Sequence, residues 1–419
     1  MPIAPGRSSS SRDFRLLWLA QTSSLAGVQF GIVAIPLTAV LTLDASPAQV
    51  GLLTSLSSAS WLILGVFVGP LVDRVAFRRS IIFSHVLRAA LLASVAVLAM
   101  SGTLGMAYLY CAVFAVGALS MVFETAYQAL LPTMSARDEL GPRNGKLAVT
   151  DGLSRTAGPS LAGYVVDALS SSAALLTQSA GYALAGVATA CMTPADGQRG
   201  ERRRLSTGSL RGTASFLWGE KTVRAMLLSE VGYLYFFNIA FAVIMVFFVR
   251  ELGITATLVG LIFATGSVGG ILSGLVSVHL SHLPLRQHLI VGSTVRAMGL
   301  ALMPLAVFMD GQEVYFLAGA RFLNSFGWTL WEVRKRTETQ LRSPEKMLGR
   351  IQGLFLFCSR SGEALGALTG ALSAALIGTI PTVVTGCLGC VLSVAVAWTT
   401  PPVPAPDAEG PDAGHGSPS

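Results

Sequence analysis

Charged residues are scarce in this chain. Asp, Glu, Lys and Arg make up 12% of its 419 residues, whereas hydrophobic residues make up 52% and the mean hydropathy is +0.63. Soluble domains carry about twice that charged fraction, roughly 25%, and a single soluble core stops growing near ~250–300 residues. The composition therefore excludes an ordinary soluble protein and favours a polytopic membrane protein.

Cysteine is also scarce, and its placement argues against a redox or metal site. The chain has five cysteines, all in apolar runs. Cys387 and Cys390 have the C-x-x-C spacing of redox and zinc motifs, but no His or Asp stands near them in the sequence. We interpret them as small residues of a membrane helix and expect neither a metal nor an organic cofactor.

Several motifs of other protein classes are missing as well. The sequence contains no H-E-x-x-H, no G-x-S-x-G and no phosphate-binding loop, so an enzyme is the least favoured class. No secretory signal peptide is evident, because the apolar run that follows Arg7, Arg12 and Arg15 is far longer than the apolar segment of such a signal.

Long apolar runs dominate what remains. A membrane-spanning helix needs ~20 mostly apolar residues, and twelve runs meet that length. They are 15–42, 49–72, 80–100, 106–131, 146–168, 172–193, 225–249, 255–279, 288–309, 313–333, 350–377 and 380–399. We therefore predict an all-α membrane protein with six helices in 14–193 and six in 225–400. The remaining segments are an N-terminal tail (1–13), a central loop (194–224) and a disordered Pro/Gly/Asp-rich tail (401–419). In the central loop, Arg202–Arg204 and the helical spacing of Leu210, Ala214 and Leu217 suggest a short basic helix on the inner leaflet; a solvated linker is the alternative.

The basic residues alternate with these runs. Loops on one side hold a single basic residue, Arg250, whereas the other side holds nearly all remaining Arg and Lys outside the runs. The positive-inside rule places both termini and the central loop in the cytoplasm of a cell with an inner (plasma) membrane. The net charge of +7 is thus a consequence of topology, and we expect lipid rather than nucleic acid as the partner of this chain.

The two halves repeat a local pattern. Gln128-x3-Pro132 ends the fourth run and Gln340-x3-Pro344 ends the tenth, each followed by a basic, Gly-containing start of the next run. Six plus six helices around a cytoplasmic loop is the layout of two parallel repeats, which place a substrate site between them near the bilayer midplane.

The stretch Gly69–Ser80, GPLVDRVAFRRS, follows the second run. Asp73 there meets the negative end of a helix dipole, which costs up to ~1 kcal/mol without a partner. The stretch resembles the loop 2–3 signature of the major facilitator superfamily, G-x-L-a-D-R-x-G-R-R/K. Three further segments resemble sequences found in the branch of this superfamily that contains macrolide-type drug exporters and siderophore exporters. They are FRLLWLAQTSSLAG (14–27), FETAYQALLP (123–132) and GRIQGLF (349–355).

That resemblance implies a conformational latch. In such transporters the aspartate packs near the start of helix eleven and holds the outward-open state. This role falls to Asp73, with Arg74 and Arg78 as partners and Gly69 allowing close helix approach. The chain departs from the signature at Ala76 and Phe77, which predicts a weaker latch; the alternative is an ordinary positive-inside loop.

The fifth run resembles the signature of drug/proton antiporters, G-x8-G-x3-G-P-x2-G-G. Its matching residues are Gly145, Ser154, Gly158, Pro159 and Gly163. Small residues allow close helix packing in lipid, and proline bends a helix. Generic packing is the alternative, since similar glycine strings occur elsewhere, but the resemblance favours export over uptake.

Ionisable residues inside the runs are candidates for function, because charge within a membrane is expensive. Glu124 has no basic residue within four positions in its own run, which suits a group that takes up and releases a proton. We rank Glu124 first as proton carrier, followed by Glu363 and Asp151. Asp151–Arg155 and Arg360–Glu363 have helical pair spacing, so both acids could instead fix packing.

The resemblance also implies that helices one, four, seven and ten line a cavity. Aromatics with a few amides suit a large amphipathic ligand, including a cationic one; helix packing is the alternative for each ring. The candidates are Gln29, Tyr127, Tyr233, Phe237, Asn238, Asn324 and Trp328.

These observations predict a proton-coupled exporter of a small amphipathic compound, such as an antibiotic or siderophore, that works as a monomer. Uptake of a nutrient by symport is the alternative, which polar, paired charges in the cavity would favour. A membrane sensor or scaffold is the third hypothesis, and it would require a folded cytoplasmic domain.

Overall fold

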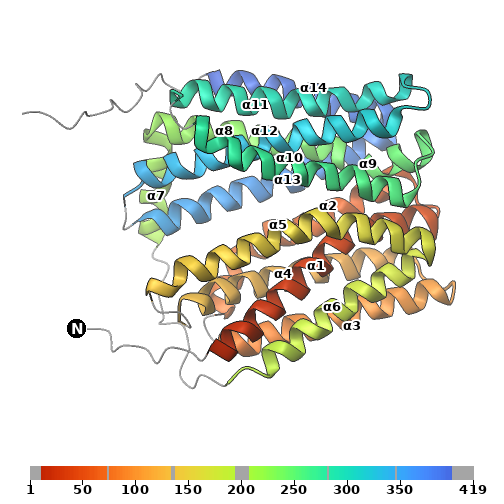
Figure 1. Cartoon of the computed structure of the whole chain (residues 1–419), viewed down its shortest axis with the longest axis horizontal. Coiled ribbons are helices and arrows are strands. Elements are labelled where there is room, and N and C mark those ends of the chain that lie inside the picture. Colours follow the sequence, from red (N-terminus) through yellow and green to blue (C-terminus); the bar gives the residue numbers. More distant parts are fainter. Residues whose placement is uncertain are drawn as a thin grey trace, which may run out of the picture.

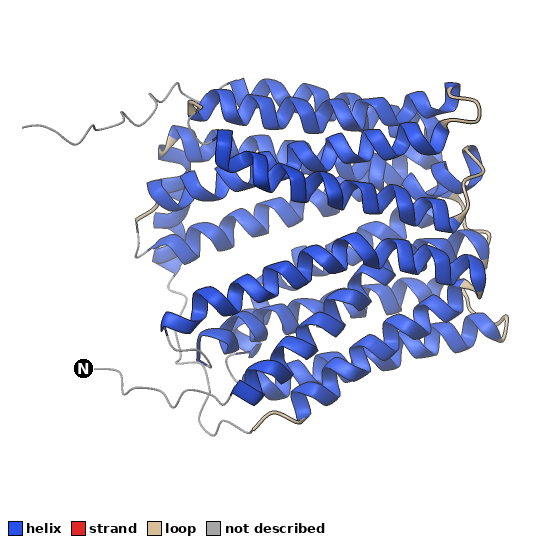
Figure 2. Ribbon diagram, in the orientation of Figure 1, coloured by secondary structure: helices blue, strands red, loops and turns tan. Residues whose placement is uncertain are grey.

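The computed structural model describes residues 11–72, 75–133, 137–193, 207–280, 283–344 and 347–398. Helices make up almost all of these ranges, and the part described contains no strand (Figure 2). The predicted all-α class is therefore confirmed.

Six long helices form an N-terminal bundle. Their ends agree with the predicted apolar runs within a few residues, except that α5 begins nine residues earlier. The helices are α1 (Ser11–Leu41), α2 (Pro47–Val72), α3 (Phe77–Met100), α4 (Met106–Thr133), α5 (Arg137–Ala168) and α6 (Ser171–Ala190). A serine begins α6 as its N-cap: the Ser170 hydroxyl accepts a hydrogen bond from Ala173 N at 3.1 Å, which satisfies one backbone donor of the first turn.

The C-terminal bundle follows the same plan with one broken helix. Its elements are α8 (Lys221–Phe241), α9 (Ile244–Val246), the π-helix η1 (Phe247–Glu251), α10 (Ala256–His279), α11 (Leu285–Leu302), the 3₁₀ helix η3 (Met303–Phe308), α12 (Glu313–Arg342), α13 (Leu348–Ile377) and α14 (Thr379–Trp398). The chain bends by 40° between α8 and the α9–η1 segment, where a single straight span was predicted.

The central segment contains a short helix, one of the two alternatives predicted for it. α7 (Thr207–Gly219) precedes α8, and its Leu217 is buried in a cluster with Leu289, Ile351 and Phe355 of the C-terminal bundle. Trp218 beside it is exposed. The segment therefore packs on the C-terminal bundle, while 194–206 with Arg202–Arg204 lie outside the described residues.

The two bundles share one arrangement of neighbours. In the N-terminal bundle the main packed pairs are α1 with α6, α3 with α6, α2 with α4, α1 with α5, and α3 with α4. Taking α8 and α10–α14 in order as their counterparts, the same five pairs occur in the C-terminal bundle. Between the bundles, α2 packs on α13 and α5 on α10.

Figure 1 shows the bundles one above the other, with helices running horizontally. We call the left end, where α1 begins, the N-end, and the opposite end, where α1 finishes, the far end. The bundles converge toward the far end and diverge toward the N-end (Figure 1).

Six helices are long and apolar enough to cross a membrane, and the bent α8–η1 pair makes a seventh, among the residues searched. They are α1, α3, α4, α10, α11 with η3, and α14. The protein is therefore a membrane protein.

Candidate functional site

A cavity of about 350 Å³ lies between the two bundles. Its wall is mostly apolar and comes from α1, α2, α4 and α6 on one side and from α8, α9 and α13 on the other. Besides the amphipathic rings of Trp61 and Tyr182, the polar side chains in the wall are Thr54, Ser57, Ser58, Ser120, Gln178 and Arg360. A concave, mainly apolar site with few polar groups is typical of small-molecule binding.

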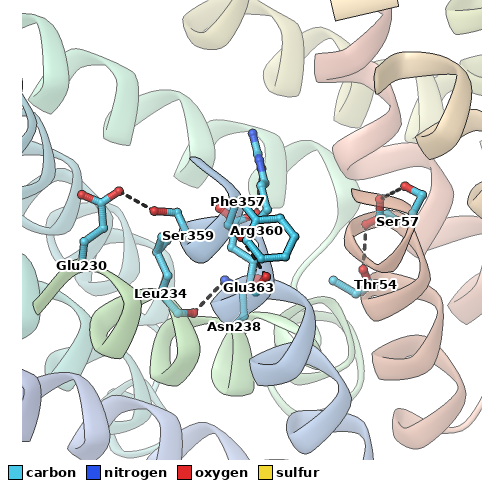
Figure 3. A network of polar contacts seen from close by, with 11 residues as sticks. Thr54, Ser57, Glu230, Leu234, Asn238, Phe357, Ser359, Arg360 and Glu363 are labelled. Carbon is cyan, nitrogen blue, oxygen red and sulfur yellow. Dashed lines mark hydrogen bonds and ion pairs between the residues drawn. The ribbon is translucent and has the colours of Figure 1, made fainter. Parts of the chain in front are cut away.

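Among the described wall residues of the cavity, Arg360 is the one that is charged. Its Nη1 donates to Glu363 Oε2 at 2.7 Å, so the predicted i,i+3 pair forms. The guanidinium also lies 5.4 Å from the ring centroid of Trp61 on α2, which connects α13 to the other bundle. Figure 3 shows the Arg360–Glu363 pair between the Glu230–Ser359 contact and the hydroxyls of Thr54 and Ser57.

Gln178 contributes a buried amide. Its side chain is 2% exposed, and its Oε1 has no hydrogen-bond partner in the described chain. A Cβ at Gly31 would lie 2.4 Å from Gln178 Nε2, so glycine there makes room for the amide. A bound molecule with a donor group would satisfy this acceptor, since buried polar groups without partners are costly.

The predicted cavity residues of the C-terminal bundle lie in a packed aromatic and amide network. The Tyr233 ring is 5.9 Å from Phe237 and 5.7 Å from Trp328. Asn324 donates to the Tyr233 hydroxyl at 2.6 Å and to Arg296 O at 2.9 Å. Asn238 donates to Leu234 O at 2.9 Å.

The two predicted cavity residues of the N-terminal bundle also pack within it. Gln29 is buried against α5, where a Cβ at Gly158 would lie 2.4 Å from its Cβ. Tyr127 stacks on Phe123 with centroids 5.7 Å apart. None of the seven predicted residues is among the described wall residues of this cavity, and Phe237 lines a separate small pocket of the C-terminal bundle.

Glu124 is near a buried arginine of the neighbouring helix. It interacts electrostatically with Arg88 on α3 and with Tyr127. Arg88 is itself held by His85 Nδ1 at 2.8 Å and lies 4.2 Å from the Tyr182 centroid. A search within four positions of one helix could not reveal this contact between helices.

Asp151 is the third predicted proton carrier, and it pairs within its own helix. Arg155 Nε donates to Asp151 Oδ2 at 2.8 Å, with the Arg155 side chain 62% exposed. Arg155 O also accepts from Ser267 of α10 at 2.6 Å. The pair therefore lies where α5 meets α10, outside the described cavity wall.

The predicted latch is only partly visible. Asp73 and Arg74 lie outside the described residues, and Gly69 is described only by its place in α2. Arg78 is described, and it contacts α6: its Nε and Nη2 donate to Thr189 O at 3.2 Å and Ala190 O at 2.5 Å. A cation at the last carbonyls of a helix is favourable, so in this conformation Arg78 caps α6.

The small residues of α5 have defined neighbours. A Cβ at Gly163 would lie 2.2 Å from Ala256 O, and one at Gly260 would lie 2.4 Å from Pro159 O. Close packing of α5 on α10 therefore requires glycine on both helices. Ser154 is half-buried, and Gly145 is described only by its place in α5.

Polar contacts also join the bundles at the far end. The Asp167 carboxylate of α5 accepts from the first two backbone N–H groups of α10, Ala256 N at 3.2 Å and Thr257 N at 2.6 Å. Arg250 pairs with Asp44 at 2.5 Å. These contacts close the molecule at the far end.

A buried ion cluster in the C-terminal bundle was not predicted from the sequence. Lys335 Nζ pairs with Glu332 Oε2 at 2.6 Å and with Glu230 Oε2. Ser359 donates to Glu230 Oε1 at 3.0 Å. The i,i+3 spacing of Glu332 and Lys335 could have predicted the pair between these two residues. The pairing of Lys335 with Glu230 on α8 could not be predicted, because it depends on how the helices pack.

No group of three or more His, Cys, Asp or Glu suited to a metal occurs among the residues searched. Cys387 and Cys390 are free and buried in α14, where they contribute to the apolar core.

Comparison with known proteins identifies the family. The model of the Major Facilitator Superfamily matches residues 17–367. The chain belongs to this superfamily. It is a membrane transporter and not an enzyme.

Among curated relatives, this superfamily member matches enterobactin exporter EntS of Citrobacter koseri at 33% identity over 123 residues. The same exporter of Escherichia coli O1:K1 / APEC matches at 32%. Each match covers 29% of this chain and 28% of the exporter.

Solved transporter structures share the fold. A bacterial homologue of the iron transporter ferroportin in the inward-facing state matches with a TM-score of 0.73 at 16% identity, covering 94% of this chain and all of the other. The nucleoside transporter NupG matches with a TM-score of 0.71 at 13% identity, covering 93% of this chain and 98% of the other. A bacterial homolog of the human lysosomal transporter Spinster, inward-facing and unoccupied, matches with a TM-score of 0.73 at 12% identity. The match covers 94% of this chain and 97% of the other.

Proposed function

We propose that this transporter exports a small amphipathic compound, such as an antibiotic, a siderophore or another secondary metabolite, in exchange for protons. The observation that carries the proposal is the mainly apolar cavity between the bundles, with scattered hydroxyls, one amide and one charged pair. Its volume of about 350 Å³ is at the lower end of the ~300–1,000 Å³ of typical ligand sites.

The topology in this proposal has twelve spans in two six-helix repeats. The five further spans are α2, α5, α6, α12 and α13, which pack side by side with those already identified. The basic loops lie at the N-end, which becomes the cytoplasmic side of the inner (plasma) membrane by the positive-inside rule. Both termini are then cytoplasmic, and a single copy holds the whole cavity and works as a monomer.

With that orientation the described conformation faces inward. Contacts between the bundles concentrate at the far end, and two of the related structures are described as inward-facing. The compound would enter the cavity from the cytoplasm or the inner leaflet. Rocking of the bundles about the cavity would then expose it to the outside.

Export is favoured over uptake by two likenesses. The curated relatives are exporters of enterobactin, and the α5 glycines that meet Gln29 and α10 occupy the positions of the antiporter signature. The proton would be carried by a carboxylate. Glu124, Glu363 and Asp151 remain candidates, and Glu363 is the one whose partner Arg360 reaches the cavity.

Nutrient uptake by proton symport is the second candidate. The Arg360–Glu363 pair at the cavity wall favours it, because paired opposite charges can hold a polar or zwitterionic substrate.

The test compares the sensitivity of cells to a panel of antibiotics, dyes and iron chelators with and without the transporter. We expect the wild type to raise resistance to some compounds, and Glu124→Gln and Glu363→Gln to reduce that resistance. Glu251→Gln, at an exposed acid of the far end, is the matched control and should behave as wild type.

If the wild type instead raises the intracellular accumulation of every compound it moves, export is wrong and uptake is correct. If Glu124→Gln and Glu363→Gln both export at the wild-type level down a proton gradient, neither acid carries the proton.

A further inference from the structure

The N-terminal side of the cavity offers mainly hydrogen-bond acceptors. The hydroxyls of Thr54, Ser57 and Ser120 donate their protons to carbonyls of their own helices, at 3.0, 2.7 and 2.7 Å. A hydroxyl that has donated its proton in this way can only accept from a bound molecule. Gln178 Oε1 on α6 is a further acceptor, buried and without a partner among the described residues. This side of the wall therefore favours a compound that carries O–H or N–H groups.

The C-terminal side of the cavity offers a cationic donor. The Arg360 side chain is 41% exposed and lines the cavity. Glu363 accepts from its Nη1, whereas its Nε has no partner among the described residues. The ring of Trp61 on α2 lies 5.4 Å from the guanidinium, and the hydroxyls of Thr54 and Ser57 lie on the same helix (Figure 3). Glu363 and Trp61 thus orient a guanidinium that keeps N–H groups for a bound acid, and its flat fork suits such a group.

The charge behind the wall adds to this preference. No Asp or Glu is among the described wall residues of the cavity. Arg321 on α12 lines a small pocket that shares Phe241 and Ile244 with the cavity. Its Nη1 donates to the uncharged oxygen of Asn324 at 3.0 Å, its Nε has no partner, and none of the described acids pairs with it. Because an uncompensated charge inside a protein is costly, an anion in the cavity would offset Arg321, whereas a cation would add to the imbalance.

The position of Arg321 is fixed by its neighbours. A Cβ at Gly266 of α10 would lie 3.0 Å from Arg321 Cγ and 3.1 Å from Arg321 Nε, so glycine there makes room for the side chain. The ring of Phe263 on the same helix lies 5.1 Å from the guanidinium. The positive charge is therefore held in place before a ligand binds, and a preorganised charge costs less to use in binding.

We propose that the transported compound is an amphipathic organic acid, bound as the anion, whose acidic group binds Arg360 and whose O–H or N–H group donates to Gln178. This inference rests on the proposed function and adds the substrate class to it. Gln178 belongs to the N-terminal bundle and Arg360 to the C-terminal bundle. A compound that engages both residues joins the two bundles across the cavity, and a cationic compound of the same shape is rejected by Arg360.

The test measures binding to the full-length protein in lipid nanodiscs, without a proton gradient. Four fluorescent compounds share one naphthalene body: hydroxynaphthoate, its uncharged primary amide, the matching hydroxynaphthylmethylammonium, and naphthoate without the hydroxyl. Equilibrium dialysis against empty nanodiscs corrects for partition into lipid. We expect the wild type to bind hydroxynaphthoate about tenfold more tightly than the amide or the ammonium, and a few-fold more tightly than naphthoate.

Variants of the two recognition residues assign each preference. Arg360→Gln combined with Glu363→Gln removes both charges of the pair, so that neither is left unpaired, and we expect it to bind hydroxynaphthoate and the amide equally. Arg360→Lys should keep a preference for the acid. Gln178→Met should bind hydroxynaphthoate and naphthoate equally and still prefer the acid over the amide. Arg342→Gln, at an arginine that pairs with two acids outside the cavity wall, is the control and should bind as wild type.

Three results overturn the proposal. They are no binding of hydroxynaphthoate to the wild type, equal binding of the acid, the amide and the ammonium, and a preference for the acid that persists in the double variant. Transport in membrane vesicles separates this proposal from export. Accumulation of only neutral or cationic compounds in everted vesicles refutes the organic acid and leaves export in place. Binding of the acid that depends on Arg360, with accumulation only in right-side-out vesicles, refutes export and supports the substrate class.

Discussion

Glycines on α5 determine how closely the bundles approach at the far end. Gly163 faces the carbonyl of Ala256, which belongs to backbone and cannot turn aside. Gly152 on the same helix has no atom within 4 Å of the position a Cβ would take. Replacing Gly163 therefore tests close packing between helices, whereas replacing Gly152 tests only the helix propensity of the residue.

We expect Gly163→Ala to destabilise the described conformation by about 1–3 kcal/mol, because an extra methyl group must displace packed backbone. Gly152→Ala should stabilise the helix by about 0.5–1 kcal/mol, since alanine loses less entropy than glycine. Thermal unfolding of both variants in the same detergent measures the difference. Equal midpoints would show that α5 and α10 do not pack as described.

At the residue scale the sequence predicted pairs within one helix. Asp151–Arg155 and Arg360–Glu363 follow from helical spacing. It did not predict Glu230–Lys335 or the contact of Glu124 with Arg88. Their partners come from helices distant in the chain, and a single sequence carries no information on which helices become neighbours.

Single helices depend on contacts at their ends, and α6 is the clearest case. Ser170 begins it and Arg78 of α3 binds its last carbonyls. The adjacent Arg79 is exposed. The basic turn thus contributes to the stability of the N-terminal bundle as well as to topology.

We expect Arg78→Gln to lower stability by about 1 kcal/mol, because it removes a cation and two charge-assisted hydrogen bonds from a helix C-terminus. Arg79→Gln is the matched control and should change stability little. Unfolding midpoints of the two variants give the result. If both lose the same amount, Arg78 acts only through the positive charge of the loop.

Element boundaries were largely predictable, because the apolar runs end where polar loops begin. α2, α4 and α10 begin or end within two residues of the predictions. The exceptions have polar sequences: α12 continues to Arg342 through charged residues, and α5 begins nine residues before the predicted run. Contacts such as Arg342 with Glu338 and Glu220 stabilise the first extension, and hydropathy does not record them.

The whole molecule is closed at the far end by contacts of unequal strength. Asp44 is 97% exposed as a side chain, and exposed ion pairs contribute little. Asp167 instead caps α10 from the opposite bundle, and removing such a cap costs about 0.5–2 kcal/mol. The cap is therefore the stronger closing contact.

We expect Asp167→Ala to increase the fraction of molecules in which the two bundles separate at the far end. Asp44→Ala should increase this fraction much less. Distances between spin labels on Ser101 and Asp310, far-end positions in exposed loops of the two bundles, report the shift. A larger effect of Asp44→Ala would show that the ion pair, rather than the cap, holds this end.

The central claim, proton-driven export, is tested most directly in everted membrane vesicles that contain the transporter. Their interior corresponds to the outside of the cell, so an exporter concentrates its compound within them. Acidifying that interior should drive accumulation of compounds from the panel, a protonophore should abolish it, and each compound taken up should move protons outward. Accumulation that occurs only in right-side-out vesicles, or that persists unchanged with the protonophore, would contradict the account.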